Sequence, residues 1–184
     1  PTLVSYPCGN CADEMNPWPT GLTDSNADDV RKRVLYDALF SGGGVEFYLG
    51  WHNLPLGGDL SIEDFRTRDD MWTYVGHARR FMEAELPFWE MHPNDSLLRN
   101  EATSIGEGQV YSKDDQVYAV YLPEASATGE LNLGSSIGAF EQFWFNPRTG
   151  EYAGQPVMIN STGGWLALGS APSEANEDWV TVLR

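Results

Sequence analysis

The sequence predicts a chain of two parts, an α/β segment followed by a small all-β segment that folds as an antiparallel sandwich. In residues 1–95 the expected elements run strand, helix, strand, helix, which is the repeating order of α/β folds. From residue 96 onward, short apolar runs alternate with clusters of turn residues, which is typical of a sandwich. The change of pattern near Pro93-Asn94-Asp95 predicts the boundary between residues 1–95 and 96–184.

The first part contains two expected strands and two expected helices. Residues 3–6 and 45–50 are rich in β-branched and aromatic residues, which favour strands. A helix is expected over residues 26–40, because acidic residues stand in its first turn and three glycines follow it. A second apolar stripe at helical spacing predicts a helix from residue 69 to Pro87. Two strands and two helices neither close a barrel nor complete a sheet, so we interpret this part as incomplete.

The second part is predicted from alternation and turn chemistry. Around residues 140–145, Phe140, Gln142 and Trp144 alternate with Glu141, Phe143 and Phe145, so both faces of a strand carry aromatic side chains and at least one must be buried. The run Asn-Pro-Arg-Thr-Gly that follows consists of residues that turns prefer. Strands are expected near residues 108–112, 116–122, 129–133, 138–145 and 151–159.

The composition excludes some classes of partner. With 27 acidic and 11 basic residues the formal net charge is −16, which opposes binding to nucleic acid or to an anionic membrane. No stretch is long and apolar enough to span a bilayer, and no signal segment opens the chain. Seven tryptophans and eight tyrosines supply rings that fill cores or stack on sugars. We expect a protein that is secreted or located at the cell surface or in the periplasm.

The only two cysteines, Cys8 and Cys11, lie close together in a polar loop. A redox pair of the thioredoxin type would stand at the start of a helix, which is not expected here. A zinc site would need two more ligands, and His52, His77 and His92 are the only histidines. We expect a local disulfide or free thiols, with a metal site and redox chemistry as alternatives, and we predict no cofactor and no metal.

Two runs near the end of the chain resemble the closing signature of a known β-sandwich. These runs are Trp144-Phe145-Asn146-Pro147-Arg148-Thr149-Gly150 and Asp178-Trp179-Val180-Thr181-Val182-Leu183-Arg184. They are similar to the family described as the "putative collagen-binding domain of a collagenase", which usually follows a glycosidase-like barrel. Nothing in these residues specifies a collagen triple helix.

Residues of the first part resemble the final strand-helix units of bacterial (β/α)8 glycosidase-like proteins, among them the apiosidase-like group. The resemblance lies in residues 29–36, 41–50 and 63–72, and residues 86–91 resemble the bridge from such a barrel into its sandwich. It implies that residues 1–95 are the last two strand-helix units of an incomplete (β/α)8 barrel and that residues 96–184 are the accessory sandwich. The missing strands would come from an N-terminal barrel part of the same protein or from a companion chain.

The resemblance implies the C-terminal portion of a secreted bacterial glycoside hydrolase that acts on a polysaccharide or oligosaccharide by carboxylate acid/base chemistry. Part of its active site would lie outside this chain, because the acid/base of this fold comes from the fourth strand. One alternative is a non-catalytic module that binds glycan or collagen. Another is a purely structural sandwich that stabilises the barrel.

The expected sugar site lies at the C-terminal ends of the strands, as in other barrels of this kind. Alternation from Val45 onward directs Glu46 and Tyr48 into the barrel, where Glu46 either pairs with an arginine of a missing strand or joins the sugar site. The resemblance implies that Glu14 is the nucleophile of a retaining enzyme and Asp13 a substrate contact. Loop solvation or calcium binding is the alternative for this acidic pair.

The segment Trp51-His52-Asn53 follows the second expected strand, where a barrel exposes its site. Trp51 would stack on a sugar ring and His52 or Asn53 would bond its hydroxyl groups, the alternative being a loop anchored by a packed tryptophan. Other residues are expected to be structural: His77 and His92 as non-catalytic histidines, Arg31-Lys32-Arg33 and Arg79-Arg80 on solvated helix faces, and Trp165 and Trp179 in the core.

Overall fold

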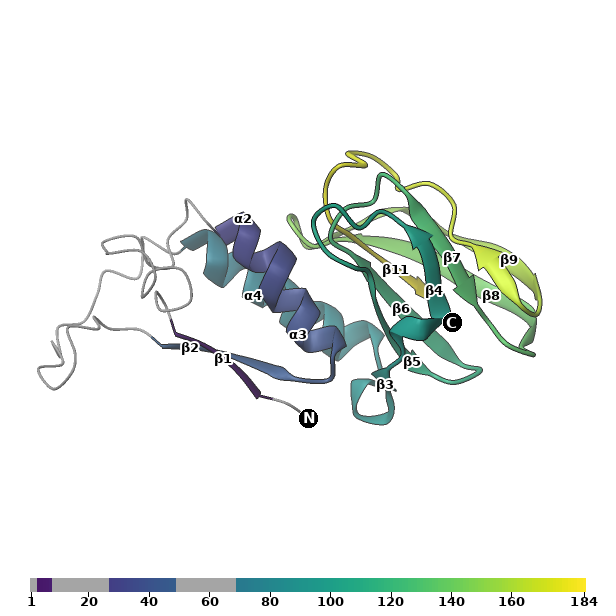
Figure 1. Cartoon of the computed structure of the whole chain (residues 1–184), viewed down its shortest axis with the longest axis horizontal. Helices are drawn as coiled ribbons and strands as arrows, with labels where there is room; N and C mark the ends of the chain where they lie inside the picture. The colour runs from purple at the N-terminus through teal and green to yellow at the C-terminus, as the bar shows by residue number, and fades with distance from the viewer. Residues whose placement is uncertain (1–2, 8–26, 49–68) are drawn as a thin grey trace, which may run out of the picture.

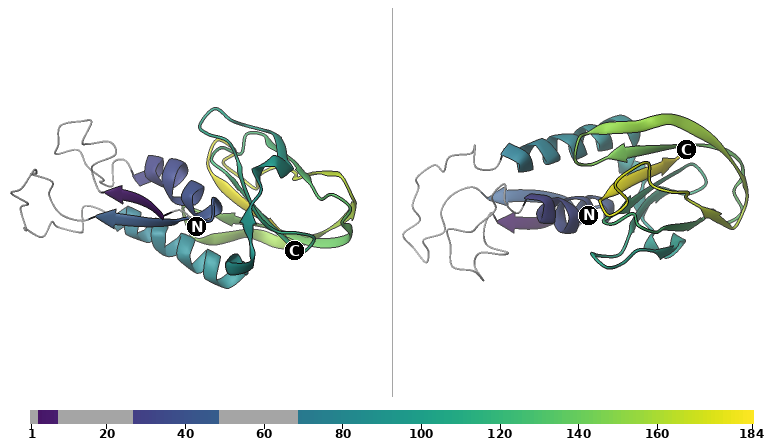
Figure 2. Two further views of the ribbon diagram at one scale, coloured as in Figure 1. Left: turned by 60° about the horizontal axis from the view of Figure 1, so that its bottom comes forward. Right: turned by 90° about the horizontal axis from the view of Figure 1, so that it is seen from above.

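The computed structural model describes residues 3–7, 27–48 and 69–184, and it arranges most of them in three layers (Figure 1). A six-stranded antiparallel sheet forms the middle layer. A three-stranded antiparallel sheet packs on one face of it, and helices pack on the other face. Two parallel strands lie beside these helices, away from the sandwich (Figures 1 and 2).

The two antiparallel sheets form the sandwich. The six-stranded sheet has the order β3 (His92–Pro93), β5 (Gln109–Lys113), β6 (Val117–Leu122), β11 (Trp179–Leu183), β8 (Ile137–Asn146) and β9 (Glu151–Thr162). The three-stranded sheet has the order β10 (Trp165–Ala167), β7 (Thr128–Asn132) and β4 (Leu98–Glu101). The antiparallel sandwich predicted for the second part is therefore confirmed.

The first part supplies the helical layer. Strand β1 (Leu3–Pro7) is followed by one continuous helical segment made of α2 (Ala27–Val30), the π-helical turn η2 (Arg31–Leu35) and α3 (Tyr36–Phe40). Strand β2 (Gly44–Tyr48) and the long helix α4 (Asp69–Glu85) come next, and the short turns η4 (Phe88–Glu90) and η5 (Asp95–Leu97) lead into the sandwich. Both helices and both strands lie within a few residues of their predicted positions, whereas the (β/α)8 barrel and the boundary at residue 95 stay predictions.

Strand β8 packs both of its faces, as its alternating sequence indicates. Phe143 and Phe145 lie in the core under the helices, whereas Phe140 and Trp144 lie in the core between the two sheets. A β-bulge in the pairing with β9 falls between Gln142 and Trp144. The six-stranded sheet is thus covered on both sides in its middle, which explains why its strands carry so many apolar residues.

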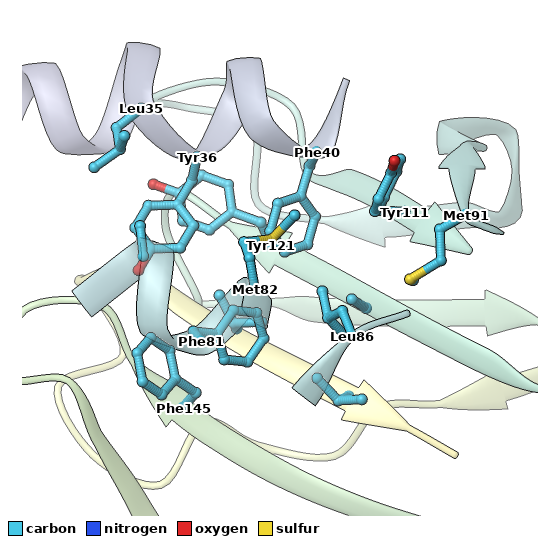
Figure 3. Packing of buried hydrophobic residues seen from close by; sticks show 14 of the residues in the cluster. Leu35, Tyr36, Phe40, Phe81, Met82, Leu86, Met91, Tyr111, Tyr121 and Phe145 are labelled. Carbon is cyan, nitrogen blue, oxygen red and sulfur yellow. The ribbon is translucent and has the colours of Figure 1, made fainter. Parts of the chain in front are cut away.

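The core under the helices joins residues from both parts of the chain (Figure 3). The ring of Phe81 from α4 stacks on Phe145 from β8 with centroids 4.5 Å apart, and Tyr36 stacks on Tyr121 from β6 at 4.9 Å. Phe40 fills the space beside Tyr121, with ring centroids 5.9 Å apart. Helices that precede residue 95 and strands that follow it therefore bury their apolar surface against each other.

A buried ion pair crosses the same interface. The side chains of Arg31 and Asp178 are both fully buried. Arg31 donates two 2.9 Å hydrogen bonds to Asp178, from Nε to Oδ2 and from Nη2 to Oδ1. Burial alone would lower the pKa of Arg31, but the hydrogen bonds and negative charge of Asp178 raise it above its ordinary value, so the arginine stays charged. This planar two-bond geometry is the strong form of an arginine–carboxylate contact.

The prediction that the basic run at residues 31–33 is solvated is wrong for Arg31. Arg31 lies on the buried side of the helix, between the buried residues Ala27 and Leu35. Lys32 keeps only 13% of its side chain exposed and pairs with Glu177 at 2.6 Å, whereas Arg33 is exposed as expected. A charged side chain tolerates such burial only with a partner, and the sequence places that partner at residue 178, far along the chain.

We expect Asp178→Ala to lower the free energy of unfolding by about 3–5 kcal/mol, because Arg31 would lose its fully buried countercharge and keep the exposed Asp28. Urea unfolding of the 184-residue chain, followed by tryptophan fluorescence, measures the loss. Arg33→Ala is the matched control, since it removes an exposed arginine of the same helix and is expected to cost about 0.5 kcal/mol or less. Equal losses in the two variants would contradict this role of the pair.

The stacked tyrosines differ in their hydroxyl groups. Tyr121 donates a 3.1 Å hydrogen bond to the carbonyl oxygen of Lys32, whereas the buried hydroxyl of Tyr36 has no hydrogen-bond partner among the described residues. We expect Tyr121→Phe to cost about 1 kcal/mol of unfolding free energy, and Tyr36→Phe to be neutral or stabilising because it removes an unsatisfied polar group. Thermal and urea unfolding of both variants measure the difference, and a larger loss in Tyr36→Phe would refute it.

Candidate functional site

Most residues predicted for the sugar site lie outside the described residues. These are Asp13, Glu14, Trp51, His52 and Asn53, and the cysteines Cys8 and Cys11 lie outside them too. For Glu46 and Tyr48 the structure describes the backbone, which belongs to β2. In the strand register Glu46 stands opposite Ser5 and Tyr48 opposite Pro7. The roles of all these residues stay predictions.

Strands β1 and β2 supply the frame of the expected site. They pair in parallel from Leu3↔Gly44 to Pro7↔Tyr48, and within the described residues no further strand pairs with them. Parallel neighbours need a crossover connection, and the helical segment 27–40 lies in it. Since both strands run in the same direction, Pro7 and Tyr48 end at the same edge of the pair. The chain therefore leaves both strands there, just before the segments that contain Glu14 and Trp51.

An apolar groove of about 800 Å³ lies at the opposite end of these strands, between α3, α4, β2 and η4. Val45, Leu39, Met82 and Trp89 contribute to its lining. Trp89 is 70% exposed. The lining is mainly apolar, and its polar side chains come from Ser41, Arg79, Glu83, His92 and Tyr111. The groove therefore fits a polypeptide segment with apolar side chains.

The two runs that resemble the sandwich family meet at one cluster of charges. Arg148, from the turn between β8 and β9, donates a 3.0 Å hydrogen bond to the carbonyl oxygen of Asp178 and a 2.8 Å bond to Glu174. On the helix side, Tyr74 donates a 2.9 Å bond to Asp28, which also pairs with Arg31. These charged groups form ion pairs and hydrogen bonds with one another and link the helices to the sandwich. We therefore interpret the cluster as structural.

His77 is structural, as predicted. Its ring is buried, its Nδ1 atom lies 3.4 Å from the carbonyl oxygen of Pro147, and it packs against Gly150 in the turn between β8 and β9. Gly150 has a φ of +73°, and a side chain there would also collide with the His77 ring. His92 is half exposed and its Nε2 atom lies 3.4 Å from a carboxylate oxygen of Asp114.

The two tryptophans expected in the core have different positions. Trp179 is 1% exposed and its indole N–H donates a 2.9 Å bond to the carbonyl oxygen of Ser173, so its assignment to the core is correct. Trp165 is 38% exposed on the outside of the three-stranded sheet, so its assignment to the core is wrong. The reason is the alternation of β10, in which Leu166 faces the core and Trp165 faces outward.

Two general features of the described part bear on function. Its residues contain no group of three or more histidine, cysteine, aspartate or glutamate side chains that could hold a metal ion. Among its helices, none is long and apolar enough to cross a membrane.

The sandwich matches a known protein family. Residues 93–184, from β3 to the end of the chain, match the family described as "Putative collagen-binding domain of a collagenase". No curated protein matches the chain.

Solved structures share the fold over most of the chain. One, named "Glycoside hydrolase", is 18% identical with a TM-score of 0.60, and the match covers 90% of this chain and 39% of that one. Another, a glycoside hydrolase family 5 protein from Bacteroides vulgatus, is 14% identical with a TM-score of 0.58, and the match covers 85% of this chain and 35% of that one. This chain therefore spans less than half of the length of either protein.

We expect stability to fall as the pH decreases from about 7.5 to 5.5 because of His77. Burial lowers the pKa of His77 below its ordinary value of 6.5, although the contact with Pro147 partly opposes this. The stability that comes from burying the neutral ring is fully present above the unfolded-state pKa. It is lost as the pH falls through 6.5 towards the lower folded-state pKa. His77→Gln should reduce the pH dependence of the urea midpoint, with His92→Gln as the control for removing a histidine. An unchanged slope in His77→Gln would exclude His77 as the cause.

Proposed function

Since the chain belongs, through its sandwich, to the family described as "Putative collagen-binding domain of a collagenase", we propose that this sandwich is the accessory domain of a glycoside hydrolase. The chain as a whole is then the C-terminal portion of that enzyme, which acts on a complex polysaccharide. The acidic composition suits a protein that is secreted or held at the cell surface or in the periplasm.

The single observation that carries this proposal is the extent of the structural match. The family match begins at residue 93, whereas the structure named "Glycoside hydrolase" is matched over 90% of this chain, which requires much of the helical part as well. A fold that extends beyond the sandwich therefore recurs in a longer protein. At 18% identity this likeness concerns the fold, and the activity remains our proposal.

The strands β1 and β2 with their helices support a barrel of the (β/α)8 type, in which residues 1–95 are the last two strand-helix units. Such a barrel gives every strand two parallel neighbours, and β1 and β2 have one neighbour each within the described residues. Val45 packs against the core of the helices, which is the side expected for the outer face of a barrel strand. The proposal places Glu46 and Tyr48 on the inner face, by alternation. Assignment to the apiosidase-like group rests on the sequence resemblance.

The polypeptide that completes the barrel has a place to pack. Leu3 pairs with Gly44, which follows Gly42 and Gly43 in the lining of the apolar groove, so any polypeptide that precedes β1 emerges beside this groove. Burial of the exposed Trp89 by such a segment would remove apolar surface from water. We propose that an N-terminal barrel part of the same protein, or a companion chain, occupies this position.

The proposed chemistry is hydrolysis of a glycosidic bond with two carboxylates. Retaining enzymes hold them about 5–5.5 Å apart, one as nucleophile and one as acid/base. We assign the nucleophile to Glu14, with Glu46 in the same set of carboxylates, and the acid/base to the polypeptide that completes the barrel. Substrate contacts are assigned to the following residues: Asp13, Tyr48, Trp51, His52 and Asn53.

Binding without catalysis is the second candidate function. The description of the family mentions collagen binding, and the exposed Trp165 on the outer sheet of the sandwich favours a ligand-binding role for this domain. This role is compatible with an accessory domain of an enzyme, because the three-stranded sheet lies on the opposite face of the six-stranded sheet from the helices.

We expect Glu14→Gln to reduce polysaccharide hydrolysis by the assembled protein on the order of 10⁴-fold or more, since the amide is neither a nucleophile nor a base. Release of reducing sugar measures the activity, and circular dichroism checks the fold. Glu151→Gln is the matched control, because Glu151 is an exposed glutamate of β9, in the sandwich and away from the groove. Full activity of Glu14→Gln would remove Glu14 from the mechanism.

A further inference from the structure

The outer face of the three-stranded sheet carries a group of side chains that neither core uses. Leu98, Leu131 and Leu166 from its three strands point into the sandwich core. The residues next to these leucines point outward by alternation, and the strand register brings Arg99 beside Glu130 and Trp165 beside Asn132. Asn100 breaks the alternation with a φ of +61° and bonds Glu130 from the same face. We call the set Arg99, Asn100, Glu130, Asn132 and Trp165 the Trp165 surface.

The polar side chains of the Trp165 surface hold one another in place. Glu130 accepts a 2.9 Å hydrogen bond from the Nε atom of Arg99 and a 3.0 Å bond from the amide nitrogen of Asn100. The side-chain oxygen of Asn132 accepts a 2.9 Å bond from the backbone N–H of Gly134. A ligand that met these groups would lose little free energy in ordering them, because they are already ordered.

The ring of Trp165 is also held, yet it stays accessible. The guanidinium carbon of Arg99 lies 3.8 Å from the ring centroid, which fixes the orientation of the indole by a cation–π contact. More than a third of Trp165 nevertheless remains exposed to solvent. The core gains nothing from a tryptophan at this position, since Leu166 supplies the inward-facing side chain of β10.

We propose that the Trp165 surface binds a neutral oligosaccharide segment of a polysaccharide, a role that rests on the proposed function and adds a second glycan contact to it. A flat indole packs against the C–H face of a sugar ring, and the planar side chains of Asn100, Glu130 and Asn132 bond hydroxyl groups. One arginine and one glutamate balance each other here, on a chain of net charge −16. A polyanionic ligand would be repelled by that charge, so a neutral glycan fits best.

A collagen-like peptide fits the Trp165 surface less well. Peptides in the polyproline II conformation dock into grooves lined by aromatic side chains. In the described part of the chain, this sheet face presents a single exposed aromatic residue, Trp165, on a flat surface of strands. One ring flanked by planar polar groups suits one sugar unit, so the glycan is the ligand that the geometry favours.

The test is binding of the 184-residue chain to a panel of neutral polysaccharides, namely arabinoxylan, galactomannan, arabinogalactan and mixed-linkage β-glucan, by affinity electrophoresis and calorimetry. We expect retardation by at least one of them, and Trp165→Ala should weaken binding about tenfold or more. Trp89→Ala is the matched control, because it removes a more exposed tryptophan from a different surface and should bind as the unchanged chain does. Thermal unfolding midpoints verify that both variants fold.

Two outcomes would overturn the proposal. One is the absence of binding to every polysaccharide of the panel, or equal weakening in Trp165→Ala and Trp89→Ala. The other is binding of a triple-helical collagen peptide that depends on Trp165, which would assign this surface to a protein ligand. Hydrolysis of a short soluble substrate by the assembled protein separates the two proposals, because it depends on Glu14 and not on Trp165. Turnover without Trp165-dependent binding would refute only the proposal that the Trp165 surface binds glycan. Binding without turnover would refute only the proposal that the assembled protein is a glycoside hydrolase.

Discussion

The buried ion pair between Arg31 and Asp178 is the contact on which the arrangement of helices and sandwich depends. Apolar packing between Phe81 and Phe145, or between Tyr36 and Tyr121, stabilises the interface but tolerates small shifts. Two hydrogen bonds of 2.9 Å between fully buried charges tolerate less displacement, because their remaining partners, Asp28 for Arg31 and Arg148 for Asp178, lie nearer the surface. The pair therefore fixes the position of the helical segment on the end of β11.

This constraint connects the proposed active site with the proposed binding surface. The helical segment that carries Arg31 is the crossover between β1 and β2, so fixing it also fixes the edge where Pro7 and Tyr48 end. The sandwich carries the Trp165 surface on its other side, across two sheets and one core. A glycan bound there would thus lie at a fixed distance and angle from the ends of β1 and β2, which under our proposal would favour action on a long polysaccharide over loose tethering of two independent domains.

Sequence reasoning succeeded where local patterns decide the structure and failed where distant contacts do. The two-faced alternation of β8 and the turn chemistry after it predicted the main hairpin, because both are local. Arg31 was assigned to solvent, since its partner Asp178 is 147 residues away and no local pattern reveals it. Strand β11 was not among the predicted strands, because it is buried on both faces and its sequence does not alternate. Trp165 was placed in the core because β10 has only three residues, too few to show which way its side chains point. The predicted residues around Glu14 and Trp51 lie outside the described part, so their site is untested.

Native-state hydrogen exchange of the 184-residue chain tests the central claim, that helices and sandwich form one cooperative unit joined by the buried pair. Amide protons in the helices α3 and α4 and in the strands β6 and β11 should exchange with the same opening free energy, equal to that of global unfolding. They should also respond together to low concentrations of urea. Helix amides that exchange at a clearly lower free energy, while β6 and β11 keep full protection, would contradict the account and make the sandwich an independent domain.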